Sequence, residues 1–213
     1  MKSPTTVPCR CGKQIALEIT GSELPDHAKC PDCGATIHLI APLGNIATML
    51  LMARAEHELS HNDATISTLL GAVAVEAEMA YLFFKWKGID SGKLPHEQTP
   101  QDRKQWEDEW ANMWSIGNRL EKLSLLLTKK PFDEFARLKI NLLKPALAGH
   151  DPAASIKDFF QDQFFERRNN IVHYGQIDFV KTVGERCLLS ATTLLNLLHA
   201  MDNTRYDLTF PKK

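Results

Sequence analysis

Four cysteines lie within the first 33 residues of the chain, in two close pairs. Cys9 and Cys11 form the first pair, Cys30 and Cys33 form the second, and a glycine follows each pair. A glycine after each pair permits tight turns whose backbone amides approach the thiolates, and four sulfurs complete the tetrahedral shell that Zn²⁺ prefers. Such a shell leaves no open coordination position for chemistry. The spacing therefore predicts a structural zinc ion held by Cys9, Cys11, Cys30 and Cys33, as in a zinc ribbon.

The ligand set has alternatives at this stage. One residue separates Cys9 from Cys11, where zinc sites usually have two or more, so His27 is a conceivable substitute ligand. Disulfide pairing is the second alternative, and a reducing compartment disfavours it. A redox Cys-x-x-Cys motif is the third, and the surrounding sequence lacks the βαβ pattern that such motifs accompany.

Residues 1–42 are too few to build a hydrophobic core of their own. Segments of about 40 residues or fewer usually need a metal or disulfides for stability. Two short runs, 15–19 and 36–40, have the composition of strands. We therefore predict a small β-type zinc ribbon over residues 1–42. Acidic and basic residues are mixed between the cysteine pairs, which leaves open whether this module binds nucleic acid or protein.

From residue 43 onward the pattern is helical. Apolar residues recur at spacings of three and four, and glycine and proline interrupt the pattern at intervals. The expected fold class is mainly α, with a helical bundle over residues 43–213 that follows the zinc ribbon. The predicted helices cover residues 45–61, 64–87, 101–129, 132–148, 153–173 and 178–202, with a loop at 88–100.

Composition narrows the function classes. The chain has 25 Lys and Arg against 26 Asp and Glu, and a net charge of −1 argues against a protein that coats nucleic acid through bulk charge. No apolar run reaches the roughly 18 to 20 residues of a membrane span, and the N-terminus lacks the apolar region of a secretion signal. We expect a cytoplasmic protein without a membrane partner.

One arginine falls on the apolar face of the predicted helix 153–173. Arg168 comes four residues after Phe164 and four before Val172, and a buried unpaired guanidinium costs several kcal/mol. The second predicted helix offers Glu76 and Glu78 as partners. Apolar residues flank Glu76 on a helical wheel, so we predict that Glu76 is buried and pairs with Arg168. The predicted buried stripe of helix 153–173 comprises Phe160, Phe164, Phe165, Ile171 and Val172.

His173 follows Arg168 by five residues, which places the two side chains roughly 140° apart on a straight helix. They do not converge on one face of one helix. The sequence Tyr174-Gly175 indicates a helix end, where a symmetric partner could supply the other half of a site. Asn169 lies one turn before His173.

This stretch resembles the R-x4-6-H signature of HEPN domains, a superfamily of helical nucleases. Arg168 is followed by a polar residue, Asn169, and the motif ends at His173 just before a long closing helix. Glu76, in an early apolar helix, is similar to an acidic position that many HEPN proteins carry. Zinc ribbons are known N-terminal companions of such domains. The resemblance covers approximately residues 45–205, with residue-level matches in these two short motifs.

The resemblance implies an α-helical homodimer that brings two motifs together at its interface. In many members it also implies RNA cleavage without a metal, since the ribose 2′-hydroxyl can attack its own phosphate. His173 would act as general base or acid, and Arg168 would stabilise charge on the transition state. Asn169 and Tyr174 would orient the phosphate, and Glu76 would position Arg168. Tyr174 directly follows the histidine, whereas in some toxin members the tyrosine lies one residue later, which leaves its role open.

RNA and a second copy of the chain are the expected partners, with an antitoxin or another protein as a further one. The expected setting is defence, stress response or a toxin-antitoxin system. Some HEPN members are noncatalytic, so an RNA- or protein-binding scaffold is the second hypothesis. A helical domain outside the family is the remaining one.

A second motif, from His57 to His61, matches the H-E-x-x-H pattern of zinc peptidases, with Glu58 as the residue that would activate water. Glu76 or Glu78 could supply a third ligand. Charged and polar neighbours, and the lack of a predicted sheet after residue 42, favour a solvated helix end instead.

Aromatic residues recur at helical spacing between residues 106 and 127. We predict a core or dimer interface there, and a base-stacking surface is less favoured because residues 107–109 are acidic. Cys187 is expected to be an ordinary core thiol. The aromatic stripe comprises Trp106, Trp110, Met113, Trp114, Leu120 and Leu127.

Overall fold

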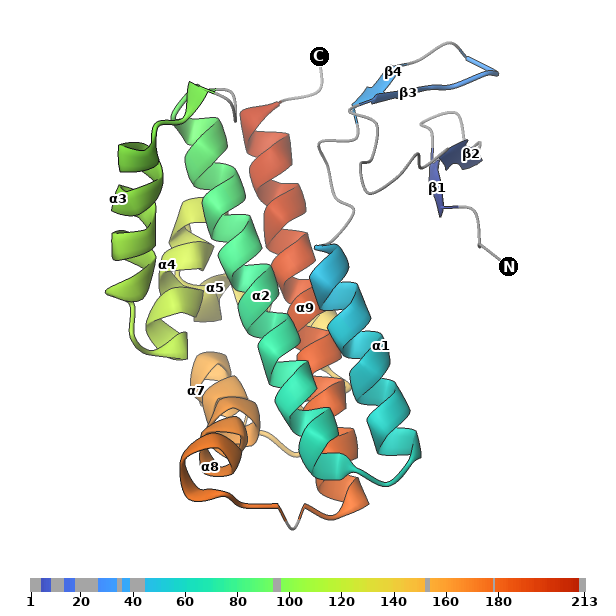
Figure 1. The fold of residues 1–213 in the computed structure, drawn as a ribbon, viewed down its shortest axis with the longest axis vertical. Helices are drawn as coiled ribbons and strands as arrows, with labels where there is room; N and C mark the ends of the chain where they lie inside the picture. The colour runs from blue at the N-terminus through green and yellow to red at the C-terminus, as the bar shows by residue number, and fades with distance from the viewer. Residues whose placement is uncertain are drawn as a thin grey trace. The chain divides into compact units, whose positions relative to one another are not determined.

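The computed structural model divides the chain into two compact units, Met1–Leu43 and Gly44–Lys213 (Figure 1). The residues that it describes are 5–8, 14–17, 27–33, 36–38, 45–93, 97–151, 154–177 and 179–210.

The N-terminal unit contains two antiparallel strand pairs. Strand β1 (Thr5–Pro8) pairs with β2 (Gln14–Leu17), and β3 (His27–Lys29) pairs with β4 (Thr36–His38). In both pairs, the cysteines lie in the sequence that links the two strands.

The second unit is mainly helical, as predicted. Helices α1 and α2 run antiparallel, α9 packs along α2, and α4 covers another side of α2 (Figure 1). The helices are α1 (Ile46–Ser60), α2 (Ala64–Asp90), α3 (Pro100–Ala111), α4 (Ile116–Thr128), α5 (Phe132–Leu138), α6 (Ile140–Leu143), α7 (Ile156–Phe160), the π turn η2 (Gln161–Phe165), α8 (Glu166–Tyr174) and α9 (Lys181–Thr209).

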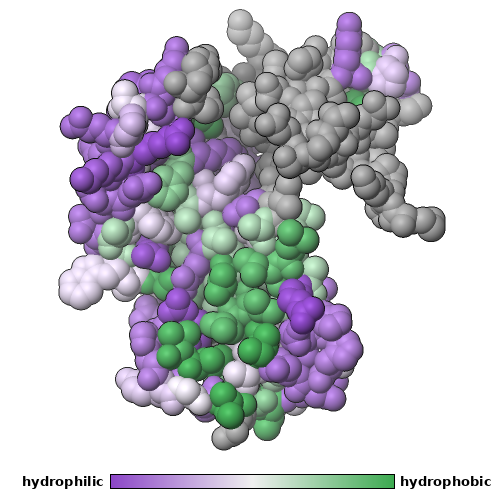
Figure 2. Space-filling model, viewed as in Figure 1, coloured by the Kyte–Doolittle hydropathy of each residue, from purple (hydrophilic) through white to green (hydrophobic). Residues whose placement is uncertain are grey.

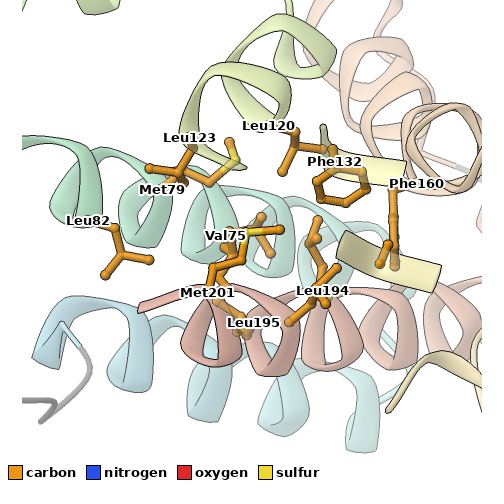
Figure 3. Close-up of a cluster of buried hydrophobic side chains, with 14 of the residues drawn as sticks. Val75, Met79, Leu82, Leu120, Leu123, Phe132, Phe160, Leu194, Leu195 and Met201 are labelled. Atoms are coloured by element: carbon orange, nitrogen blue, oxygen red, sulfur yellow. The ribbon is translucent and has the colours of Figure 1, made fainter. Parts of the chain in front are cut away.

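The core of this unit lies between α2, α4 and α9 and is closed at one side by α5, α7 and η2 (Figure 3). Its side chains interdigitate at the three- and four-residue spacing from which the helices were predicted. Buried members include Val75, Met79, Leu120, Leu123, Phe132, Phe160, Phe164, Leu194 and Met201.

The long apolar helix α2 belongs to this core. In the part of the chain that the structure describes, it alone has the length and hydropathy of a membrane span, and 56% of the relevant 18-residue window is buried inside the unit. Its apolar composition is explained by the number of neighbours, since α1, α4, α8 and α9 all contact it.

The predicted helix 101–129 is wrong in one respect, because it breaks between Ala111 and Ile116. The Ser115 side chain accepts a hydrogen bond from the Asn118 amide at 3.1 Å and so caps the start of α4. Arg119 Nε donates to the Met113 carbonyl at 2.8 Å, which satisfies a backbone group that the break leaves without a helical partner.

The predicted helix 153–173 also differs from the structure. It contains a π turn, η2, between α7 and α8. A π turn takes up one more residue than an α turn, so it changes the direction of the side chains that follow. Phe160, Phe164 and Phe165 are buried as predicted, but Val172 is 51% exposed and the predicted stripe does not reach it.

Candidate functional site

An ion pair joins the two segments that carry the predicted site. Nη2 of Arg168, on α8, lies 3.5 Å from Oε1 of Glu76, on α2. The predicted pairing of these two residues is therefore present. Both side chains are partly exposed, 27% for Arg168 and 22% for Glu76. Arg168 Nη1 also donates to Asn169 Oδ1 at 2.9 Å. The Arg168 guanidinium therefore contacts two other residues of the predicted site, Glu76 and Asn169.

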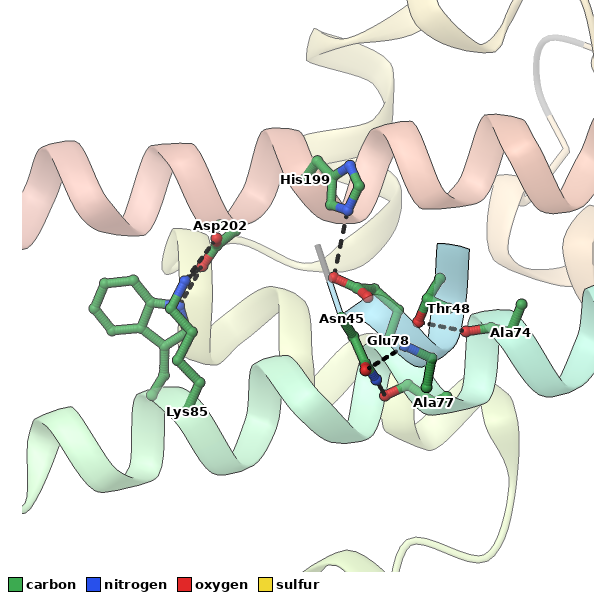
Figure 4. A network of polar contacts seen from close by, with 10 residues as sticks. Asn45, Thr48, Ala74, Ala77, Glu78, Lys85, His199 and Asp202 are labelled. Atoms are coloured by element: carbon green, nitrogen blue, oxygen red, sulfur yellow. Dashed lines mark hydrogen bonds and ion pairs between the residues drawn. The ribbon is translucent and has the colours of Figure 1, made fainter. Parts of the chain in front are cut away.

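The prediction that Glu76 would be the buried glutamate is wrong. Glu78 is the buried one, at 1% exposed, and its Oε1 lies 3.3 Å from Nε2 of His199 on α9 (Figure 4). Glu78 lies on the side of α2 that packs on α9, whereas Glu76 lies on the side that meets α8. The wheel of α2 was misleading because this helix has neighbours on several sides.

Arg168 and Glu76 line a cleft of about 500 Å³. Its walls come from α2, from the break between α3 and α4, from η2 and from α8, so both irregularities of the helical pattern contribute to it. Other lining residues include Trp114, Arg119, Gln161, Glu166 and Asn169.

The guanidinium of Arg168 has hydrogen-bonding capacity left. Guanidinium carries five N–H donors in a planar fork. Contacts to Glu76 and Asn169 involve Nη2 and Nη1, and each of these atoms carries a second N–H that can serve a ligand. The Nε has no hydrogen-bond partner in the described part of the chain, but it is buried and closed to a ligand. An arginine held by a carboxylate with donors to spare can bind an anionic oxygen such as that of a phosphate.

His173 and Tyr174 lie at the other end of α8 and are exposed. Neither lines the cleft. Gly175 ends the helix with φ +65°, and its amide donates to the Ile171 carbonyl at 3.1 Å. One chain thus gathers Glu76, Arg168 and Asn169 and leaves His173 and Tyr174 apart from them.

The structure gives the H-E-x-x-H motif no support as a peptidase site. The rings of His57 and His61 stack on one another, with centroids 4.2 Å apart, and Glu58 pairs with Arg54. The proposed third ligands are engaged elsewhere, Glu76 with Arg168 and Glu78 with His199. Among the residues that the structure describes, no group of three or more His, Cys, Asp or Glu side chains could hold a metal ion.

The cysteines of the predicted zinc site fall only partly within the described residues. Cys9 and Cys11 lie outside them. Cys30 is buried, Cys33 is exposed, and a turn at residues 31–33 leads from β3 toward β4. A pair of thiolates at such a turn fits one half of a four-cysteine zinc site. The zinc ion stays a prediction.

Cys187 is a core thiol, as predicted. Its side chain is buried in α9, and burial raises the pKa of the thiol. A buried thiol with a raised pKa is a poor nucleophile, because the reactive species is the thiolate.

The aromatic stripe divides in two. Trp106 and Trp110 pack against the core as predicted, and the Arg119 guanidinium lies 4.8 Å from the centre of the Trp110 ring. Trp114 is 91% exposed, so it does not belong to the core, and its place at a dimer interface stays a prediction. The cleft residues Trp114, Arg119 and Gln161 were missed because they depend on two breaks in the helices. A serine three residues before Asn118, typical of a helix N-cap, was the available signal.

Comparisons of the chain with protein-family models, with curated proteins and with solved structures find no match.

Proposed function

We propose that the chain is a HEPN-like endoribonuclease that cleaves RNA without a catalytic metal. The observation that carries this proposal is the contact between Glu76 and Arg168 at the wall of a cleft. These residues belong to the two separate motifs on which the resemblance to HEPN domains depends. Charge compensation alone also joins an arginine to a glutamate in a helical bundle, so the support for the nuclease is that this pair lies at a cleft rather than inside the core.

In this proposal each residue has a distinct task. The carboxylate of Glu76 orients Arg168, whose remaining donors bind the scissile phosphate and stabilise the charge that develops as the 2′-hydroxyl attacks. The carboxamide of Asn169 contacts the same guanidinium and orients it further. His173 takes or gives the proton, as histidine side chains commonly do in general acid–base catalysis.

A homodimer supplies what one chain lacks. Because His173 and Tyr174 are exposed outside the cleft, the proposed site is completed when α8 of a second copy approaches. Val172, in the last turn of α8, and Ile177 and Val180, in the segment that follows it, are all more than half exposed. Hydrophobic residues also gather on the face that carries α1 and α2 (Figure 2). Exposed apolar surface of this kind favours association of copies.

A noncatalytic HEPN scaffold that binds RNA or protein is the second candidate. The separation of His173 from the Arg168 cleft within one chain favours it, since a binding module needs no histidine beside the arginine. A role in defence, stress response or a toxin-antitoxin system, with an antitoxin as partner, is compatible with both candidates.

Cleavage of single-stranded RNA in magnesium-free buffer tests the nuclease directly. We expect Arg168→Ala and His173→Ala to lower the cleavage rate by roughly 100-fold or more, the usual effect of losing a charge-stabilising group or a general base. The products should carry 2′,3′-cyclic phosphates, and both variants should remain dimers by light scattering.

His61→Ala is the matched control, because His61 is another exposed histidine and belongs to the peptidase-like motif. Its cleavage rate should equal that of the wild type. A wild-type dimer that binds RNA or protein and leaves a varied set of RNAs intact would contradict the nuclease and support the scaffold.

A further inference from the structure

The indole of Trp114 stands apart from the other three tryptophans of the chain. Trp86 is buried, Trp106 and Trp110 are partly buried against the core, and Trp114 is 91% exposed. It lies at the cleft that also contains Arg168. A tryptophan normally buries a large area in a core or an interface. An indole left open at a cleft is available to a flat ligand.

The backbone around Trp114 is held in place on both sides. The Met113 amide donates to the Trp110 carbonyl at 3.2 Å, and Arg119 Nε donates to the Met113 carbonyl at 2.8 Å. On the other side, Ser115 caps α4. Because the backbone is ordered, only the rotations of the indole itself remain to be fixed when a ligand binds.

The polar groups of the cleft offer hydrogen bonds without excess charge. The cleft is lined by two arginines, Arg119 and Arg168, and by two glutamates, Glu76 and Glu166. Their charges cancel, so a phosphate alone is not the ligand that this cleft fits best. Carboxamides from η2 and α8 line the same cleft and carry both a donor and an acceptor, as the edges of nucleobases do.

We infer that the cleft holds one unpaired nucleobase of a single-stranded RNA, stacked on the Trp114 indole, next to the phosphate that Arg168 binds. The identification of the polymer as RNA rests on the proposed function. The volume of about 500 Å³ lies in the range of small-ligand sites, which suits a base with its sugar. The base must be unpaired, because bases inside an A-form duplex are stacked on one another and closed to the indole.

The test measures binding of the full-length protein to a short single strand of 2′-O-methyl RNA, which lacks the attacking hydroxyl. We expect Trp114→Ala to weaken binding by about 5- to 150-fold, the range for loss of one stacked base, and Trp114→Phe to keep most of the affinity. Phe210→Ala is the control, since Phe210 is an exposed aromatic residue that does not line the cleft. It should bind as the wild type does.

Two altered ligands separate base stacking from other contacts. A strand of abasic nucleotides and a duplex of the same sequence should both bind wild type as weakly as the normal strand binds Trp114→Ala. Equal affinity of wild type and Trp114→Ala for the single strand would overturn the inference. Equal affinity of wild type for the normal, abasic and duplex ligands, no affinity for any of them, or a protein partner whose binding alone needs Trp114, would also overturn it.

The inference and the nuclease fail in distinguishable ways. Binding that depends on Trp114 without any cleavage by the wild type supports the base site and contradicts the nuclease. Cleavage that Arg168→Ala abolishes, with a KM that Trp114→Ala leaves unchanged, supports the nuclease and overturns the base site.

Discussion

Asp202 is a carboxylate inside the helical unit, and its neighbours explain why it can stay there. Its two oxygens accept hydrogen bonds from Lys85 Nζ at 2.9 and 2.8 Å, and Oδ1 also accepts one from Trp86 Nε1 at 2.6 Å (Figure 4). The carboxylate is 3% exposed and the lysine 10%. Two ionised groups this deep depend on each other, because either one alone would be a charge without compensation.

We expect Lys85→Met to lower the free energy of unfolding by about 3 kcal/mol, since Asp202 then keeps only the Trp86 hydrogen bond. Urea unfolding followed by circular dichroism measures this change. Lys130→Met is the control, because Lys130 forms an exposed pair with Glu134, and such pairs contribute less than about 1 kcal/mol. If both variants lost the same free energy of unfolding, the buried Lys85–Asp202 pair would contribute no more to stability than an exposed pair does.

Single residues were also where the sequence was most informative about the site. A charged residue on an apolar face needs a partner, and this argument correctly joined Arg168 to Glu76. The choice between Glu76 and Glu78 as the buried glutamate failed, because burial depends on which neighbouring helix covers each side of α2. That information is not present in the pattern of one helix.

At the scale of elements, the helices were predictable and their interruptions were not. The predicted helices 45–61 and 64–87 correspond closely to α1 and α2, since Asp63 supplies a side-chain cap that accepts the Ile66 amide at 2.8 Å. The breaks at residues 112–115 and the π turn at 161–165 keep apolar spacing on both sides, so periodicity alone does not detect them. These interruptions form the walls of the cleft.

Two glycines allow a matched test of how closely the elements approach. A Cβ at Gly184, in α9, would lie 2.8 Å from Ala64 Cβ and 2.9 Å from Leu59 Cδ1, whereas a Cβ at Gly71, in α2, would meet nothing nearer than 3.5 Å. We expect Gly184→Ala to destabilise the protein by about 1 to 3 kcal/mol through overpacking. Gly71→Ala should be neutral or stabilising by up to about 1 kcal/mol, because alanine favours the helix. Thermal unfolding compares them, and equal melting temperatures would contradict this close approach.

At the scale of the whole molecule, we expect cysteine reactivity to differ between the two units. If the four N-terminal thiolates hold zinc, a thiol reagent at pH 8 should modify almost none of the cysteines of the folded protein until a chelator is added. Four thiols should then appear. The fifth, Cys187, should react only after unfolding, because burial raises its pKa and keeps the protonated form at this pH.

Cys187→Ala is the control, and in this variant unfolding should release no further thiol. Four thiols that react at once, with no chelator present, would contradict the zinc site.

A mixture of two inactive variants tests whether the proposed site is shared between copies. If Arg168 of one protomer works with His173 of its partner, a heterodimer of Arg168→Ala and His173→Ala protomers contains one intact site. Random mixing makes half of the dimers mixed, so we expect about one quarter of wild-type RNA cleavage. No recovery after subunit exchange, shown to be complete by mass spectrometry, would place both residues of a working site in the same chain.

The π turn before α8 affects the direction of the Arg168 side chain without changing the residues of the Arg-to-His motif. Whether Arg168 points at Glu76 is decided by the number of residues in η2, not by the letters that follow it. A chain shortened by one residue there would keep the whole Arg-to-His signature and direct its arginine elsewhere. The Arg-to-His motif alone is therefore not enough to identify such a site in a sequence. The length of the turn that precedes the motif must also be known.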